Sequence, residues 1–124
     1  MGTPDQRPPV WVGHITLTTN EIPNTYDFLV RLGMRPIEQG EAFAVLELRG
    51  GTHLVLIRAD DATPGPAGFD LMVEDIEATH QQLRTAGFET SAIETGKIHH
   101  SFTVTSPAGH SIQFNSSHVS DQPV

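Results

Sequence analysis

The sequence repeats one pattern at a spacing of 54 residues. The segment HITLTTNEI (14–22) aligns with GFDLMVEDI (68–76), and the same spacing carries Gly33 onto Gly87. A constant spacing across a β-rich segment, an amphipathic segment and a glycine indicates two copies of one module. A chain of 124 residues, 37% of them hydrophobic, can build one core, whereas half of it would be marginal. We therefore expect two modules that fold together.

The first module, at about 10–58, predicts a strand, a helix and three strands. Residues 11–18 are rich in β-branched and aromatic side chains and suit the first strand. Asn20 is the expected N-cap of the helix and Gly33 its end. The three further strands are expected at 34–38, 42–48 and 52–58, with Gly50 and Gly51 turning between the last two.

The second module, at about 68–116, follows a connector at 59–67 that is rich in proline, glycine and aspartate. Asp75 is the expected N-cap of its helix, and Gly87 ends it. Its strands are expected at 69–73, 88–93, 99–105 and 110–115, with the turn 106–109 between the last two.

Composition excludes several classes of function. Fifteen acidic residues against seven basic ones give a net charge of −8, which disfavours nucleic acid and anionic membranes as partners. The absence of cysteine excludes disulfides and thiolate chemistry. No apolar run reaches the length of about 18 residues expected of a membrane span, and the first ten residues lack the apolar core of a signal peptide. We expect a cytoplasmic protein with no membrane partner.

Six motifs together resemble one family: HITLTT, FLVRLGM, THLVLI, FDLMVEDIEA, LRTAGF and TVTSPAGHSIQF. The chain is similar to the vicinal oxygen chelate superfamily, which includes glyoxalase I, extradiol dioxygenases, fosfomycin resistance enzymes and bleomycin resistance proteins. The resemblance implies an α+β fold of two tandem βαβββ modules whose curled sheets enclose a common cleft. It also implies a homodimer.

The resemblance further implies four metal-ligand positions, which fall on His14, Val55, Gly68 and Gln113. Val55 and Gly68 carry no donor atom, and Gln113 offers a neutral amide oxygen where the family has glutamate. We therefore expect no metal cofactor. If a divalent ion binds, His14 and Gln113 are its expected ligands.

Strand parity predicts which other side chains enter the cleft. If the turn 106–109 pairs Thr105 with the residue after the turn, Phe102 opposes Gln113 and His100 opposes Asn115. A one-residue slip would instead turn His99 inward and His100 outward. His53 shares the face of Val55. The expected ligand pocket therefore comprises His14, His53, His100, Phe102, Gln113 and Asn115.

The remaining polar candidates are expected to pack in the structure or to face solvent. His80 lies on the helix stripe equivalent to Tyr26, which favours packing. His110 and His118 are expected in solvent, beside a turn and in the tail. Glu47 is expected to face water, with a ligand or base role at the cleft rim as the alternative.

Two functions remain open. We favour a small-molecule binding protein of the glyoxalase/bleomycin resistance type that sequesters an aromatic or cationic compound without a metal. The alternative is a metal-dependent lyase, isomerase or dioxygenase that acts on a small vicinal-oxygen substrate, with His53, His100 or Glu47 as an additional ligand. The sequence does not decide whether the chain is an enzyme, and no catalytic residue is assigned.

Overall fold

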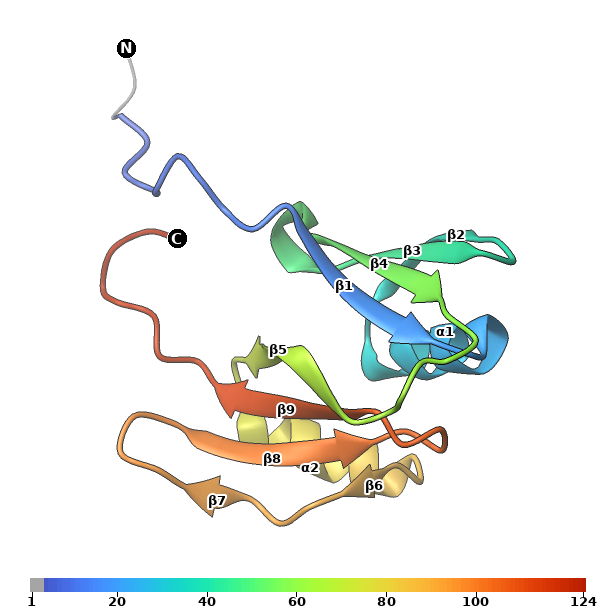
Figure 1. Ribbon diagram of the computed structural model, residues 1–124. Coiled ribbons are helices and arrows are strands. Elements are labelled where there is room, and N and C mark those ends of the chain that lie inside the picture. Colours follow the sequence, from blue (N-terminus) through green and yellow to red (C-terminus); the bar gives the residue numbers. More distant parts are fainter. Residues whose placement is uncertain (1–3) are drawn as a thin grey trace.

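The computed structural model describes residues 4–124 as two sheets, each with one helix (Figure 1). The first module forms a four-stranded sheet and the second a five-stranded sheet, and the two sheets do not close into a barrel. The predicted α+β class and the tandem strand, helix, strand order are confirmed. No helix within residues 4–124 is both long enough and apolar enough to cross a membrane.

The first module has the strand order β1-β4-β3-β2. Strands β1 and β4 are parallel, and the other neighbours are antiparallel. A short 3-10 turn at Arg49–Gly51 joins β3 to β4, and both of its glycines have positive φ, as the predicted tight turn requires. The elements are β1 (His14–Thr19), α1 (Ile22–Leu32), β2 (Arg35–Gln39), β3 (Phe43–Glu47) and β4 (His53–Arg58).

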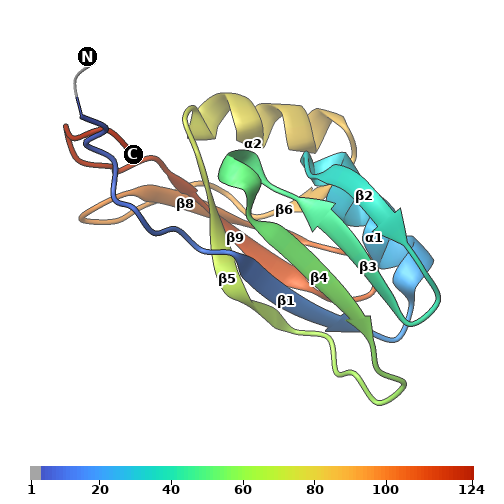
Figure 2. The same cartoon turned by 90° about the horizontal axis from the view of Figure 1, so that it is seen from above.

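The second module has the order β5-β9-β8-β6, with β7 also paired to β8. Strand β5 begins at Pro66, inside the expected connector, and two-residue strands replace the single strand expected at 88–93. Strands β1 and β5 run side by side where the two sheets meet (Figure 2). The elements are β5 (Pro66–Val73), α2 (Ile76–Thr85), β6 (Glu89–Thr90), β7 (Glu94–Thr95), β8 (His100–Thr105) and β9 (Ser111–Ser116).

Local sequence signals explain the helix ends, with one correction. Asp75 caps α2 as predicted, because its carboxylate accepts a hydrogen bond from the Ala78 amide at 3.0 Å. Helix α1 stops at Gly33, whose φ of 121° is accessible to glycine. The predicted cap Asn20 is wrong: Glu21 occupies that position, and its amide is satisfied by the Thr19 hydroxyl at 3.1 Å.

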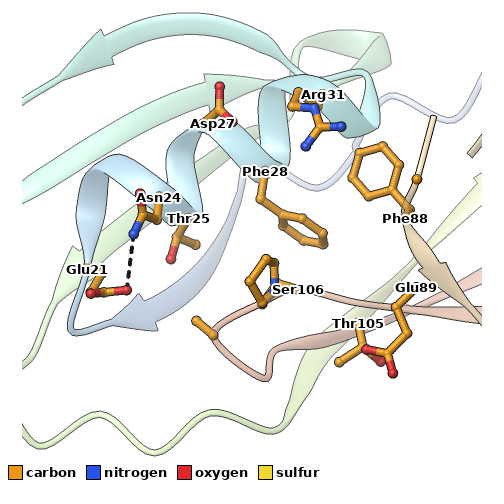
Figure 3. Close-up of a pocket in the computed structure, with 13 residues that line it drawn as sticks. Glu21, Asn24, Thr25, Asp27, Phe28, Arg31, Phe88, Glu89, Thr105 and Ser106 are labelled. Atoms are coloured by element: carbon orange, nitrogen blue, oxygen red, sulfur yellow. Dashed lines mark hydrogen bonds between the residues drawn. The ribbon is translucent and has the colours of Figure 1, made fainter.

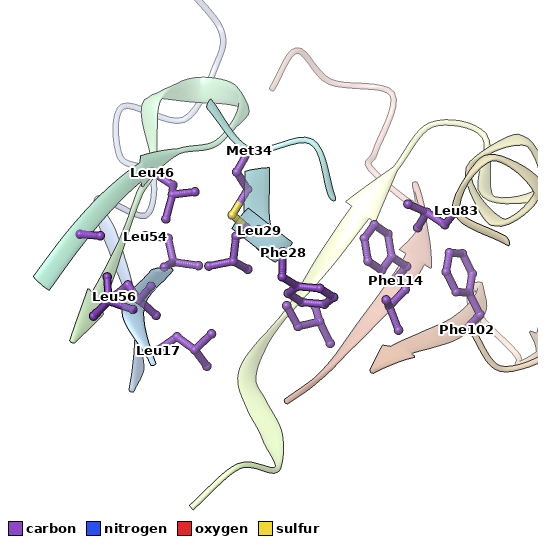
Figure 4. Packing of buried hydrophobic residues seen from close by; sticks show 14 of the residues in the cluster. Leu17, Phe28, Leu29, Met34, Leu46, Leu54, Leu56, Leu83, Phe102 and Phe114 are labelled. Atoms are coloured by element: carbon purple, nitrogen blue, oxygen red, sulfur yellow. The ribbon is translucent and has the colours of Figure 1, made fainter. Parts of the chain in front are cut away.

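Each sheet buries one face against its own helix. In β4 the side chains of Leu54 and Leu56 are fully buried, while Ile57 points to the other face and is 40% exposed. In the second module Phe102 stacks on Phe114 with ring centroids 5.1 Å apart. Figure 4 shows these two groups with Phe28 of α1 between them, so one apolar cluster spans both modules.

His110 forms a hydrogen bond between the second module and the first. It lies in the β8–β9 loop and is 4% exposed, so the expected solvated position is wrong. Its Nε2 bonds the carbonyl oxygen of Thr18 in β1 at 3.0 Å. Nearby, the guanidinium of Arg31 lies 4.6 Å from the centre of the Phe88 ring. These contacts fix how the edges of the two sheets meet.

Substitutions on the two faces of β4 should lower the free energy of unfolding by different amounts. Leu54→Ala removes a fully buried side chain and should lower the free energy of unfolding by about 2–5 kcal/mol. Ile57→Ala, three residues along the same strand, should cost about 0.5 kcal/mol, because its side chain already meets water. Urea denaturation of both variants checks this, and equal losses would contradict the assignment of the faces.

Candidate functional site

A row of polar side chains crosses the whole first sheet on the face that its helix leaves uncovered, called here the open face of that sheet. His14 of β1 pairs with His53 of β4, His53 with Glu47 of β3, and Glu47 with Arg35 of β2. The rings of His14 and His53 have centroids 6.0 Å apart. Sequence reasoning singled out the first two and weighed Glu47, but missed Arg35, because only the register across four strands aligns it with the others.

Hydrogen bonds hold the centre of this row. Glu47 Oε2 lies 2.9 Å from His53 Nε2, and Glu47 Oε1 accepts from Arg35 at 2.7 Å. A neutral His53 that donates its Nε2 proton to this carboxylate keeps the lone pair on Nδ1. The carboxylate thus orients the imidazole, as acidic partners do for histidines that bind ligands or protons.

Beside this row, the two middle strands β3 and β4 present apolar side chains on the open face. Val45 lies opposite Val55, and Phe43 lies opposite Ile57, one step further from the polar row. Phe43 is 46% exposed and Ile57 is 40% exposed. An exposed apolar surface that ends in a polar row suits a small molecule with an apolar body and a polar head group.

In the second sheet the predicted pairing of β8 with β9 is wrong by one residue. Thr105 pairs with Ser111 instead of His110, and Gln113 therefore lies opposite Thr103. The physical reason is the connecting loop, which is one residue longer than expected: the Ser106 amide donates to the His110 carbonyl at 2.7 Å and closes it. Relative to the predicted register, this one-residue slip exchanges the two faces of β8, so every side chain of the strand lies on the face opposite to the predicted one.

Two predicted pocket residues consequently lie away from the open face of the second sheet. Phe102 is 2% exposed and packs in the core between Phe114 and the edge of His80, so its predicted place in the pocket is wrong. His100 shares the face of Phe102, and its Nδ1 bonds the Thr95 hydroxyl at 3.1 Å. His99 turns inward in its place, as the alternative register predicted.

The open face of the second sheet contains a polar hollow of about 670 Å³. Gln113 and Asn115 line it, together with His99, whose ring stacks on His118 at 5.4 Å. Asp70 of β5 also lines it and was missed, although strand parity from Gly68 would have placed it on this face.

The predicted pocket residues are therefore divided between two sheets. His14 and His53 lie on the first open face, and the residues that line the hollow all belong to the second module or to the tail that follows it. The reason is that the sheets meet along β1 and β5 without closing. The hollow itself is not the common cleft that the resemblance implied.

The family's metal-ligand set does not fit this chain. Of the four positions, Val55 and Gly68 have no donor atom, and Gln113 supplies only a neutral oxygen that a divalent ion binds weakly. Within residues 4–124, no three side chains of histidine, aspartate or glutamate are grouped so as to hold an ion. His14 and His53 are neighbours on the open face of the first sheet, but no third ligand joins them within the described residues.

A different hollow lies between α1 and the β8–β9 loop (Figure 3). Its floor is Phe28 and Phe88, whose rings meet edge to face at 5.8 Å, and Arg31 reaches across to the Ala86 carbonyl at 3.3 Å. None of the predicted site residues lines it. Its contacts join the two modules, and we assign it a structural role.

Solved structures share this fold. A lactoylglutathione lyase from Agrobacterium tumefaciens superposes with a TM-score of 0.75 at 13% identity, over 90% of this chain and 97% of that one. A member of the glyoxalase/bleomycin resistance protein/dioxygenase superfamily from Sphaerobacter thermophilus gives 0.75 at 19%, over 87% and 98%. The bleomycin-binding protein of Streptomyces verticillus, complexed with copper(II)-bleomycin, gives 0.66 at 21%, over 90% and 99%.

Sequence comparison identifies the family. No curated protein matches the chain in sequence. The family model of the Glyoxalase/Bleomycin resistance protein/Dioxygenase superfamily matches residues 11–114, which includes every strand and both helices except the last two residues of β9. The chain therefore belongs to the Glyoxalase/Bleomycin resistance protein/Dioxygenase superfamily.

Proposed function

We propose that this protein is a cytoplasmic small-molecule binding protein that sequesters an aromatic or cationic compound without a metal ion. The observation that carries the proposal is the loss of donor atoms at Val55 and Gly68, on a chain whose open sheet faces still present binding groups. The net charge of −8 favours a cationic ligand. One fold neighbour is named for binding bleomycin.

The amphipathic open face of the first sheet supports an aromatic body in the ligand. Flat rings bury apolar area against Val45, Val55, Phe43 and Ile57, whereas His53 and Glu47 provide a directed hydrogen-bonding edge. Each buried Å² of apolar surface contributes about 25 cal/mol, so a ring of ordinary size gains several kcal/mol there.

A homodimer would place the open face of the first sheet of one chain against the open face of the second sheet of its partner. Within one chain the hollow belongs to the second sheet alone, and we propose that a second copy faces the apolar part of the first sheet with the ligand between them. The exposed run Val10, Trp11 and Val12 extends from the start of β1 and offers further apolar contact.

Light scattering coupled to gel filtration should give twice the 13.5 kDa chain mass, and the mass of a single chain at high concentration would contradict this.

Ion content separates the proposal from its alternative. We expect tag-free protein dialysed against manganese, iron, nickel and zinc to hold no ion above background by plasma mass spectrometry, because the family's ligand set is incomplete. About one ion per chain, lost in His14→Ala, would contradict the proposal. It would favour the metal-dependent lyase, isomerase or dioxygenase, for which the neighbouring His14 and His53 offer two imidazole ligands.

Ligand binding should stabilise the protein against heat. A compound present at a hundred times its Kd adds about 2.7 kcal/mol to the free energy of unfolding. A thermal-shift screen of aromatic and cationic compounds, antibiotics among them, should therefore yield stabilising ligands. His53→Ala should reduce the shift by at least about half, since charge-assisted and aromatic contacts are lost.

His100→Ala is the matched control for this screen, because His100 is exposed and faces away from the open side of its sheet. It should leave the thermal shift unchanged. A shift that is lost in His100→Ala but kept in His53→Ala would place the ligand elsewhere and contradict the assignment.

A further inference from the structure

Three side chains on the open face of the second sheet form a continuous chain of hydrogen bonds. Gln113 Nε2 donates to Asn115 Oδ1 at 2.9 Å, and Asn115 Nδ2 donates to Asp70 Oδ2. Asp70 and Gln113 are direct partners on the neighbouring strands β5 and β9, and Asn115 lies two residues beyond Gln113 on the same face. Asn115 is buried, with 5% of its surface exposed, whereas Asp70 and Gln113 are exposed.

The carboxylate fixes the direction of this chain. An ionised Asp70 only accepts hydrogen bonds, so Asn115 must turn its NH₂ group toward it and its carbonyl oxygen toward Gln113. Gln113 must then turn its own NH₂ group to Asn115. Its carbonyl oxygen Oε1 is left as an acceptor, and no residue among 4–124 donates to it or to Asp70 Oδ1.

The two residues that carry the remaining acceptors occupy paired positions on neighbouring strands and line the same hollow. Paired residues on neighbouring strands are about 4.8 Å apart, so a carboxylate oxygen and an amide oxygen lie one strand apart on this face. At Gly68 there is no side chain, and a methyl group built there would meet no atom within 4 Å. The stacked rings of His99 and His118 form another wall of the same hollow.

The charge of this surface favours an organic cation. Asp70 forms no ion pair with any lysine, arginine or histidine of residues 4–124, so its negative charge is not compensated there. A metal ion would require at least about three converging donors, and this surface has a single anionic one. A planar group with several N–H donors matches two neighbouring acceptors better.

We propose that Asp70 Oδ1 and Gln113 Oε1 bind an amidinium or guanidinium group of the ligand, with Asn115 as a positioning residue between them. The inference rests on the proposed binding function and specifies the chemical class of the ligand. One N–H of the cation is donated to the carboxylate, and a second is donated to the amide oxygen. The open face of the second sheet is then the cation-binding part of the site.

Three probes that share one ring and differ only in their head group test this inference: benzamidine, benzamide and benzoate. Titrations followed by the side-chain NH₂ signals of Gln113 and Asn115 in NMR spectra should give benzamidine a Kd at least about ten-fold lower than that of benzamide. Benzoate should not bind, because Asp70 repels it. Asp70→Asn should weaken benzamidine binding at least about ten-fold.

Asp61→Asn is the matched control, because it removes the same charge from an exposed position outside the hollow. At 0.15 M salt it should change the benzamidine Kd less than about two-fold. Gln113→Leu keeps the carboxylate and should weaken benzamidine binding as well, so the inference stays testable if Asp70→Asn unfolds. Equal binding of benzamidine and benzamide, or benzamidine binding that survives both substitutions, would overturn it.

The two proposals fail in different ways. If none of the three probes shifts the NH₂ signals of Gln113 and Asn115 while other compounds still raise the melting temperature, the cation site is overturned and the binding function stands. If no compound in the thermal screen raises the melting temperature either, both are overturned.

Discussion

In each sheet, one face is covered by a helix, and this determines which side chains are exposed on the opposite face. The position of every candidate site residue follows from it. Because strand side chains alternate, the residues that pack under the helices determine which residues stay available on the opposite face. Leu54 and Leu56 are buried under α1, and this leaves His53 and Val55 on the open face. A shift of one residue in any strand would exchange the core with the binding surface.

Signals that act over a few residues made much of the fold predictable. The repeat, the cap at Asp75 and the stops at Gly33 and Gly87 depend on local backbone chemistry, and the structure contains them. The register of β8 against β9 was not predictable in this way. It depends on the loop 106–110, which the backbone hydrogen bond between Ser106 and His110 closes and whose His110 bonds the carbonyl of Thr18, about 90 residues away in the chain.

In the candidate site, the residues whose faces do not depend on the pairing of β8 with β9 were predicted on the correct face, and those whose faces depend on it were not. His53 was placed by parity within its strand, and His14 and Gln113 by the resemblance to the family; all three lie on open faces, as does Asn115, two residues beyond Gln113. Phe102 and His100 were misplaced, because their faces depended on the loop length. Arg35 became visible only once pairing across several strands aligned it with Glu47, whereas Asp70 could have been found by parity from Gly68 within its own strand.

The central claim is that a small molecule binds to the open faces of the sheets without the family's metal centre. A crystal structure of the protein with the compound that stabilises it most tests this directly. The account predicts the compound in contact with His53 or with Gln113 and Asp70, and no ion between it and the protein. A compound seated in the groove between α1 and the β8–β9 loop, or held through an ion on His14, would contradict it.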